Sequence, residues 1–173
     1  MLRVERLTAE AAAAAVGELA DVLAECVEAG ASVSFMAPFD RAEGVAHFEA
    51  AAAEAAAGRR ILFAAYDDSG RAVGTVQVLL AMPPNQPHRG EIAKLLVRPS
   101  ARGQGIARQL MERAEAEAIA EGKTLLLLDT ASDVAERLYE RLGWTRLGVV
   151  PGFALLPDGA PCDTTFFWKR IGS

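Results

Sequence analysis

The chain has few residues of the kinds that build disulfide frameworks, metal sites or nucleic-acid interfaces. Its 173 residues include 2 Cys and 2 His, too few and too scattered for a disulfide framework or a metal site. A formal net charge of −5 and a pI near 5.1 disfavour nucleic acid and anionic membranes as partners. No apolar run approaches the ~20 residues of a membrane span. We therefore expect a cytoplasmic protein with no metal, no nucleic-acid partner and no membrane partner.

Apolar residues, by contrast, make up 51% of the chain, which suits a single domain over residues 1–173 with one core. Their spacing predicts strands at 2–7, 61–66, 72–81, 91–97, 124–129, 144–150 and 164–170, and helices at 8–30, 40–57, 106–122 and 133–142. The order β-α-α-β-β-β-α-β-α-β-β indicates a mixed α/β fold. Pro151, Pro157 and Pro161 predict a long loop between the last two strands.

The segment at residues 91–117 joins an apolar strand to a helix through a basic, glycine-rich turn. Pro99 cannot donate a ladder hydrogen bond, so the strand should end near Val97, and helical spacing starts at Ile106. Gly103 and Gly105 lack the Cβ atoms that would keep a ligand away from the backbone. The first-turn amides of a helix have no intrahelical partner. This junction is therefore predicted to hold an anion such as a phosphate.

The residues of this turn leave three interpretations open. Arg102 and Arg108 place positive charge beside the amides of an otherwise acidic chain, which favours a phosphate ligand. A tight strand-to-helix turn without a ligand would also use two glycines. A dinucleotide would suit Gly103-x-Gly105 together with Asp129, which ends the next apolar run. Arg108 at the third glycine position, and the gap of roughly five residues between strand and turn, argue against the dinucleotide.

Two motifs in the second half of the chain resemble those of a known family. Residues 102–107, Arg-Gly-Gln-Gly-Ile-Ala, are similar to the Arg/Gln-x-x-Gly-x-Gly/Ala motif with which GCN5-related N-acetyltransferases (GNAT) bind acyl-CoA. Residues 135–144, Ala-Glu-Arg-Leu-Tyr-Glu-Arg-Leu-Gly-Trp, resemble the family's A-x-x-L-Y-x-x-x-G-F/W signature. The resemblance covers nearly the whole chain. Segments 74–77, 128–130 and 150–165 resemble the tabtoxin-resistance type of small-molecule acetyltransferase.

The resemblance implies the GNAT acyl-CoA N-acyltransferase fold, a mostly antiparallel seven-stranded sheet that is splayed at strands 4 and 5 and flanked by about four helices. It implies acetyl-CoA as co-substrate, with the diphosphate on the turn amides and the pantetheine arm in the splay. Ser132 stands where many family members have an Asn that touches this arm. The implied cofactor-binding residues are Leu95, Leu96, Val97, Arg102, Gly103, Gln104, Gly105, Ile106, Ala107, Arg108 and Ser132.

Acetyl transfer to an amine needs a neutral nucleophile and an acid for the leaving thiolate. An amine with a pKa of ~10.4 is neutral only about once in a thousand at pH 7, so a base is expected. The candidates are Asp129, at the carboxyl end of the adjacent strand, and Glu91. Strand alternation places Glu91 on the face of Leu95 and Val97. By resemblance, Tyr139 protonates the thiolate. The alternatives are a helix cap for Asp129, an exposed carboxylate for Glu91 and a core tyrosine for Tyr139.

The acceptor is less well defined by the sequence. Phe35 and Met36 lie in a predicted loop, and they either fill the core or, as the resemblance implies, line an acceptor pocket. The resemblance favours direct transfer, in a ternary complex, from acetyl-CoA to a primary amine of a small amino-acid-like or toxin-like molecule, as in detoxification. Protein or peptide N-terminal acetylation and a non-catalytic acyl-CoA-binding regulator stay open. So does a homodimer, which is common in the family.

Overall fold

A computed structural model describes residues 2–172 as one mixed α/β unit, so that Met1 and Ser173 of the predicted domain lie outside the described residues. The elements are β1 (Arg3–Arg6), α1 (Ala9–Glu28), α2 (Arg41–Ala56), β2 (Arg60–Tyr66), β3 (Ala72–Leu79), β4 (Arg89–Val97), a 3-10 turn (Pro99–Ala101), α3 (Ile106–Ala120), β5 (Leu125–Thr130), α4 (Asp133–Arg141), β6 (Thr145–Leu155) and β7 (Pro161–Arg170). The seven strands form one sheet in the order β1-β2-β3-β4-β5-β7-β6. The predicted fold is confirmed.

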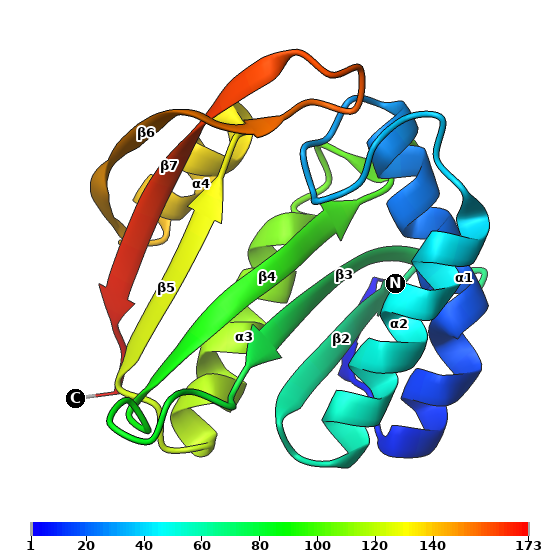
Figure 1. Cartoon of the computed structure of the whole chain (residues 1–173). Helices are drawn as coiled ribbons and strands as arrows, with labels where there is room; N and C mark the ends of the chain where they lie inside the picture. The colour runs from blue at the N-terminus through cyan, green and yellow to red at the C-terminus, as the bar shows by residue number, and fades with distance from the viewer. Residues whose placement is uncertain (1, 173) are drawn as a thin grey trace.

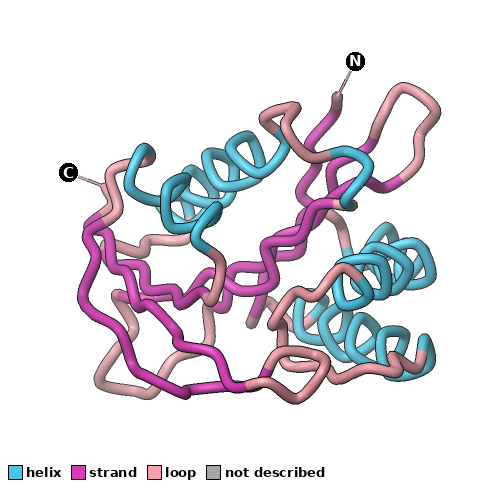
Figure 2. The backbone as a smooth tube through the Cα atoms, turned by 90° about the horizontal axis from the view of Figure 1, so that it is seen from above, coloured by secondary structure: helices cyan, strands magenta, loops and turns pink. Residues whose placement is uncertain are grey.

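The sheet separates two helical layers (Figures 1 and 2). Helices α1 and α2 pack on one face over a core that includes Leu23, Phe48 and Leu62, and we call this the α1–α2 face. Helix α3 packs on the other face over a core that includes Leu110 and Phe167, and this is the α3 face. Thr8 and Asp40 are the N-caps of α1 and α2, and each side chain accepts a hydrogen bond from a first-turn N–H. Within residues 2–172, no helix has the length and apolar character needed to cross a membrane.

Strands β4 and β5 separate soon after they meet. They are the one parallel pair in the described sheet, and they are paired only where Arg89–Glu91 lies beside Leu125–Leu127. Beyond these residues the two strands diverge, which Figure 1 shows as a V that opens toward the carboxyl ends of both. The remaining part of β4 keeps its pairing with β3 but presents an unpaired edge toward β5. This edge is the splay that was predicted at strands 4 and 5.

A bulge interrupts β4 at Lys94. The φ angle of Lys94 is +53°, in the left-handed region that non-glycine residues rarely adopt, and the register against β3 shifts nearby. In a regular strand Ile92 and Leu96 would share a face, because side chains alternate with a period of two. Instead Ile92 packs in the core of the α3 face, whereas Leu96 is buried on the α1–α2 face. The bulge therefore changes which face every later residue of β4 occupies.

One prediction about Glu91 is wrong for this reason. Regular alternation placed its carboxylate on the same face as Leu95 and Val97, but these two residues pack against the core of the α3 face, together with Ile92. Glu91 precedes Ile92 and so points to the opposite, α1–α2 face. The carboxylate consequently lies on the same side of the sheet as the helices α1 and α2.

The predicted long loop between the last two strands is also wrong. Strand β6 continues to Leu155 and β7 already begins at Pro161, so that only a five-residue turn remains, closed by a hydrogen bond of 2.8 Å from the Leu156 N–H to the Ala160 carbonyl. A bulge between Val150 and Ala154 interrupts the pairing. Strand β6 is an edge strand, where proline is tolerated because the outer amide positions need no partner.

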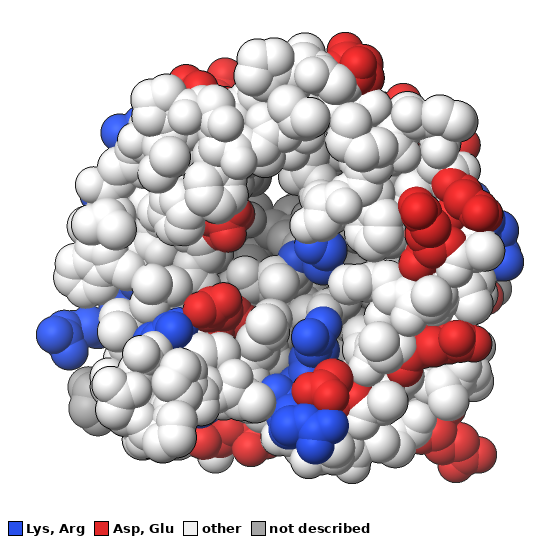
Figure 3. Space-filling view, viewed as in Figure 1, with Lys and Arg blue, Asp and Glu red and all other residues white. Residues whose placement is uncertain are grey.

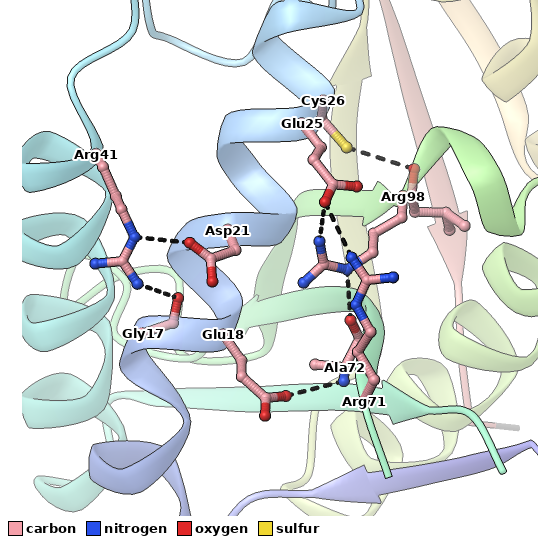
Figure 4. Close-up of polar contacts among 10 residues, drawn as sticks. Gly17, Glu18, Asp21, Glu25, Cys26, Arg41, Arg71, Ala72 and Arg98 are labelled. Atoms are coloured by element: carbon pink, nitrogen blue, oxygen red, sulfur yellow. Dashed lines mark hydrogen bonds and ion pairs between the residues drawn. The ribbon is translucent and has the colours of Figure 1, made fainter. Parts of the chain in front are cut away.

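A buried arginine fastens α1 to the sheet (Figure 4). The Arg98 side chain is 3% exposed, and its Nε donates to the Ala72 carbonyl at 2.7 Å while Nη1 pairs with the Glu25 carboxylate. Glu18, about two turns before Glu25 on the same face of α1, accepts from the Ala72 N–H at 2.9 Å. Polar groups at the end of β4 and the start of β3 are thereby satisfied by α1, which fixes the end of β4 next to the glycine-rich turn.

Candidate functional site

The N-terminus of α3 forms an open cradle of backbone amides. Gly105 is the residue before the helix, with φ of +77°, and no side chain caps the first turn. Gly103 has φ of +78°, and a Cβ at either glycine would meet no atom within 4 Å, so the space beyond both is open. The first intrahelical bond at this end is donated by Gln109. The amides of the preceding turn are therefore available to an anion, as predicted.

The two arginines of the cradle differ in their surroundings. Arg102 is exposed, and its Nε donates to the Val97 carbonyl at 3.3 Å, so the guanidinium lies beside the carboxyl end of β4. Arg108 instead pairs with Glu112 one turn along α3, at 2.7 Å, and this carboxylate raises the pKa of the guanidinium. Gln104 is exposed beside them. Arg102 thus supplies the uncompensated positive charge of the cradle.

The remaining predicted cofactor-binding residues next to the cradle differ in their surroundings. Ile106 and Leu96 are buried in the cores of opposite faces, so their contribution to a ligand is limited to their backbone groups. Leu95 and Val97 lie on the α3 face next to the unpaired edge of β4. Ala107 is half-buried at the helix start. The cradle and the β4 edge are continuous through the turn 98–105, which is the shape an extended coenzyme requires.

Tyr139 lies on α4 beneath the splay. The side chain is 4% exposed and packs against Trp144 and Phe167, with ring centroids 6.1 and 5.7 Å away. Its hydroxyl has no hydrogen-bond partner among residues 2–172. Every fully buried side-chain oxygen or nitrogen in that range does have a partner, so the Tyr139 oxygen is not fully buried and must reach an open space. Burial raises the pKa of Tyr139, and the charge of Asp129 raises it further, so the hydroxyl stays protonated.

Ser132 caps the helix that carries Tyr139. Its Oγ accepts from the Ala135 N–H at 3.2 Å, so Ser132 is the N-cap of α4. The Thr130 hydroxyl oxygen accepts from the Ser132 N–H at 3.1 Å. Because Ser132 Oγ acts as an acceptor in this bond, its hydroxyl proton remains available to a ligand. The predicted contact of Ser132 with the coenzyme arm stays a prediction.

The two candidate bases lie on the α1–α2 face. Asp129 follows Leu128, which is buried in the core of the α3 face, and therefore points the other way. Its carboxylate is exposed on the wall of the splay, yet enclosed enough that loss of water raises its pKa; the charge of Lys94 opposes this and that of Glu91 adds to it. Glu91 accepts from Arg89 Nη1 at 2.6 Å, so one of its oxygens is already engaged.

The loop between α1 and α2 meets the turn of the β6–β7 hairpin across the mouth of the splay. The Ala37 N–H donates to the Pro157 carbonyl at 2.9 Å, and Ser32 Oγ donates to the Leu155 carbonyl at 3.1 Å. Phe35, in this loop, stacks edge-on against Phe39 at 5.5 Å, and the neighbouring Met36 is 44% exposed. Phe35 is therefore packed while Met36 is exposed, and a role of this pair in lining an acceptor pocket stays a prediction.

Sequence reasoning missed a polar cluster on the α1–α2 face. Arg60 Nη1 donates to Gln77 Oε1 at 2.5 Å, Gln77 Nε2 lies 3.2 Å from His47 Nε2, and Lys94 Nζ donates to Ser34 Oγ at 3.1 Å. Figure 3 shows this face hollowed at its centre, between the β6–β7 hairpin and the α1–α2 loop, with basic and acidic side chains around the rim. The one available signal was a lysine between the apolar residues Ala93 and Leu95 of the central strand.

His47 is neutral in this cluster. Burial lowers its pKa to about 4, helped by the positive charges of Lys94 and Arg60. No group of His, Cys, Asp and Glu within residues 2–172 has the arrangement to hold a metal ion.

Comparison with known sequences decides the family. The sequence model of the acetyltransferase (GNAT) family matches residues 24–144, which include β4, the cradle and Tyr139. The chain belongs to the GNAT family. A curated relative, an IAA acetyltransferase from Azospirillum brasilense, is 44% identical over 61 residues, which are 34% of this chain and 40% of that protein. The match thus spans less than half the length of that relative.

Solved structures share the GNAT fold along the whole chain. A putative acetyltransferase from Salmonella typhimurium, solved with acetyl-CoA, has a TM-score of 0.81 at 18% identity and covers 100% of this chain and 95% of its own. A GNAT phosphinothricin acetyltransferase from Sinorhizobium meliloti, also in complex with acetyl-CoA, gives 0.81 at 19% identity, with 99% and 89% covered. At these identities the likeness concerns the fold. The finer tabtoxin-resistance resemblance stays a prediction.

Proposed function

We propose that this GNAT protein transfers the acetyl group of acetyl-CoA to a primary amine of a small, amino-acid-like acceptor, directly within a ternary complex. The observation that carries the proposal is the uncapped N-terminus of α3, whose free amides open at the end of the unpaired edge of β4. The residues present fit the coenzyme, since Gly103 and Gly105 leave room for a diphosphate and Arg102 adds a charge. Two proteins of similar fold were solved with acetyl-CoA.

Each proton of the reaction has a candidate group in this chain. Asp129, or Glu91 through water, takes a proton from the acceptor ammonium and so frees its lone pair for attack on the thioester carbonyl carbon. A backbone N–H of β4, from Leu95 or Val97, donates to the carbonyl oxygen as negative charge develops there. As the C–S bond breaks, Tyr139 gives its hydroxyl proton to the sulfur. The nitrogen, now acylated, loses a second proton, and Tyr139 is reprotonated through solvent.

The closed mouth of the splay favours a small acceptor over a protein chain. The contacts from Ala37 and Ser32 to the hairpin turn join the two walls where an extended polypeptide would have to pass. Protein or peptide N-terminal acetylation is the second candidate function. A non-catalytic acyl-CoA-binding regulator is the third. Tyr139, Glu91 and Asp129, gathered around the splay, support catalysis over regulation.

A thiol-release assay with a panel of small amines, amino acids and peptides tests the proposal. Calorimetry with acetyl-CoA and NAD in parallel measures the donor site separately. We expect saturable binding of acetyl-CoA alone and thiol release with some small amines. Binding without release for any amine would favour the regulator, release only with peptides would favour the N-terminal acetyltransferase, and binding of NAD in place of acetyl-CoA would refute the donor assignment.

We also propose that the protein forms a homodimer through the edge strand β6. Five residues of this strand carry exposed apolar side chains, and two of them, Leu147 and Phe153, are 70% and 53% exposed. An edge strand with apolar side chains presents both unpaired backbone groups and a surface that water disfavours. Light scattering behind a sizing column should give twice the monomer mass, and Phe153→Asp should return the protein to the monomer; a wild-type monomer would refute the proposal.

A further inference from the structure

Two positively charged side chains of the polar cluster lie on the acceptor side without an ion-pair partner. Within residues 2–172, Arg60 and Lys94 make no contact within 4 Å with a carboxylate, whereas neighbouring Arg59 is paired with Glu54 at 2.6 Å. Ile61 and Val76 pack in the core of the α3 face, so Arg60 and Gln77 point to the α1–α2 face. Arg60 therefore faces the hollow, as Lys94 does through its bond to Ser34.

The positions of both cations are fixed by hydrogen bonds. Gln77 is fully buried, and its amide accepts from Arg60 at 2.5 Å while the amide nitrogen lies 3.2 Å from His47 Nε2. Because His47 is neutral, its Nε2 is free to accept from Gln77, which fixes the amide and with it the guanidinium. Phe35 packs edge-on against the His47 ring at 5.7 Å. The chain from Arg60 to Phe35 is thus preorganised.

Lys94 owes its position to the bulge in β4. It follows the last residue pair of β4 and β5, Glu91 and Leu127, so its side chain lies where the strands have separated. Its Nζ donates to Ser34 Oγ at 3.1 Å, which leaves further protons for a ligand. Burial lowers the pKa of Lys94, the charge of Arg60 lowers it further, and Asp129 across the splay opposes this. Two cations that disfavour each other's charge gain from an added anion.

We propose that Arg60 and Lys94 form an anion-binding subsite for the acceptor. The acceptor is then a zwitterion, such as an amino acid with a free carboxylate, whose anionic group contacts Arg60 and Lys94 while its ammonium faces Asp129. This arrangement pairs each charge of the hollow with the opposite charge of the ligand. The inference deepens the proposed function and rests on it, because it concerns the acceptor of the same reaction.

The chemistry of amines makes the test selective. Converting the carboxylate of an amino acid to a carboxamide removes the anion but also lowers the pKa of the amine, so the amide has more of the neutral nucleophile at pH 7. An enzyme without an anion subsite should therefore acetylate the amide at least as well as the acid. A preference for the acid requires a contact that recognises the carboxylate.

The experiment measures kcat/KM for the twenty standard L-amino acids, each paired with its carboxamide. We expect the wild-type protein to prefer the acid of its best pair by about 10-fold or more, as charged hydrogen bonds provide. Lys94→Met and Arg60→Met should each lower kcat/KM for the acid by roughly 10- to 100-fold and that for the amide by less than about 3-fold. Arg113→Met, an exposed charge deletion on α3, is the matched control and should change neither.

Failure of this inference is distinguishable from failure of the proposed function. Equal use of acid and amide by an active wild-type enzyme, or equal losses for both in Lys94→Met, would overturn the anion subsite but leave the acetyltransferase intact. If no amine is acetylated, calorimetry of acid and amide against the protein saturated with acetyl-CoA still decides: binding of the acid that Lys94→Met abolishes supports the subsite, and no preference refutes it.

Discussion

Replacing Tyr139 with Phe should separate catalysis from stability in this protein. The hydroxyl makes no hydrogen bond within residues 2–172, while the ring packs against Trp144 and Phe167 and is kept in the variant. Loss of the hydroxyl should therefore change the free energy of unfolding by less than about 1 kcal/mol. Acetyl-CoA should bind as before, because the amide cradle at the start of α3 is untouched.

The rate, in contrast, should fall steeply. General acid catalysis contributes roughly 10²- to 10⁴-fold, so kcat should drop by about 10² or more, which corresponds to ~2.7 kcal/mol of activation free energy. Because burial raises the pKa of Tyr139, its ionisation should cause no loss of wild-type activity as pH approaches ~10, the ordinary value for tyrosine. Steady-state thiol release over about pH 6–10 measures kcat and its dependence on pH. Calorimetry measures the binding of acetyl-CoA.

Tyr66→Phe is the matched control for this variant. It is the other of the chain's two tyrosines, and its ring lies under the Arg3 guanidinium, 5.3 Å away, at the far end of β2. We expect wild-type kcat from it. A Tyr139→Phe enzyme with kcat within about 3-fold of wild type would show that solvent protonates the thiolate, and the assignment of Tyr139 as the acid would be wrong.

Three further changes test other parts of the structure. Gly105→Ala should raise the Kd for acetyl-CoA by about 10-fold or more, because a Cβ would enter the cradle at a φ of +77°. In the wild type the folded state holds the pKa of His47 near 4, so the stability that comes from a neutral His47 is lost as pH falls from about 6.5 to 4. His47→Gln removes this loss, so its free energy of unfolding should fall by about 2 kcal/mol less than that of the wild type over the same range. Arg98→Met should destabilise by about 3 kcal/mol, because the Ala72 carbonyl loses its side-chain donor and Glu25 keeps only the more exposed Arg71 as a partner.

Each of these changes has its own control and decisive outcome. Gly122→Ala carries the same backbone penalty at the other end of α3, with φ of +80° and open space, so it should lose stability equally but bind acetyl-CoA normally. Identical pH profiles of urea unfolding for wild type and His47→Gln would show that His47 titrates normally. Arg113→Met should cost less than about 0.5 kcal/mol, and an equal cost for Arg98→Met would mean that the Arg98 contacts contribute nothing.

The elements of this fold were predictable because their patterns are local. Helical spacing, caps such as Thr8 and Asp40, and glycines after helix ends define each element within a few residues of sequence. The cradle was predictable for the same reason, since strand, turn and helix follow one another along the chain. Tyr139 was placed by resemblance, and the structure adds that its hydroxyl is protonated and open.

What escaped prediction depends on contacts between distant segments. Alternation assumes a regular strand, and the sequence gives no sign that Lys94 adopts a positive φ and reverses the faces of β4. The proline rule that predicted a loop applies to central strands, and which strand lies at the edge is known only from the sheet order. The cluster of Arg60, Gln77 and His47 combines three elements whose proximity no local pattern reports.

The bridge between the α1–α2 loop and the hairpin turn joins Ser32 to Leu155, which lie 123 positions apart in the sequence. The turn that receives the loop exists only where β6 and β7 pair in their correct register. A fault in that pairing should therefore displace the α1–α2 loop over the hollow, far from the amides at the start of α3. Choice of acceptor is thus tied to the outermost strands of the sheet, and grip on the coenzyme to its centre.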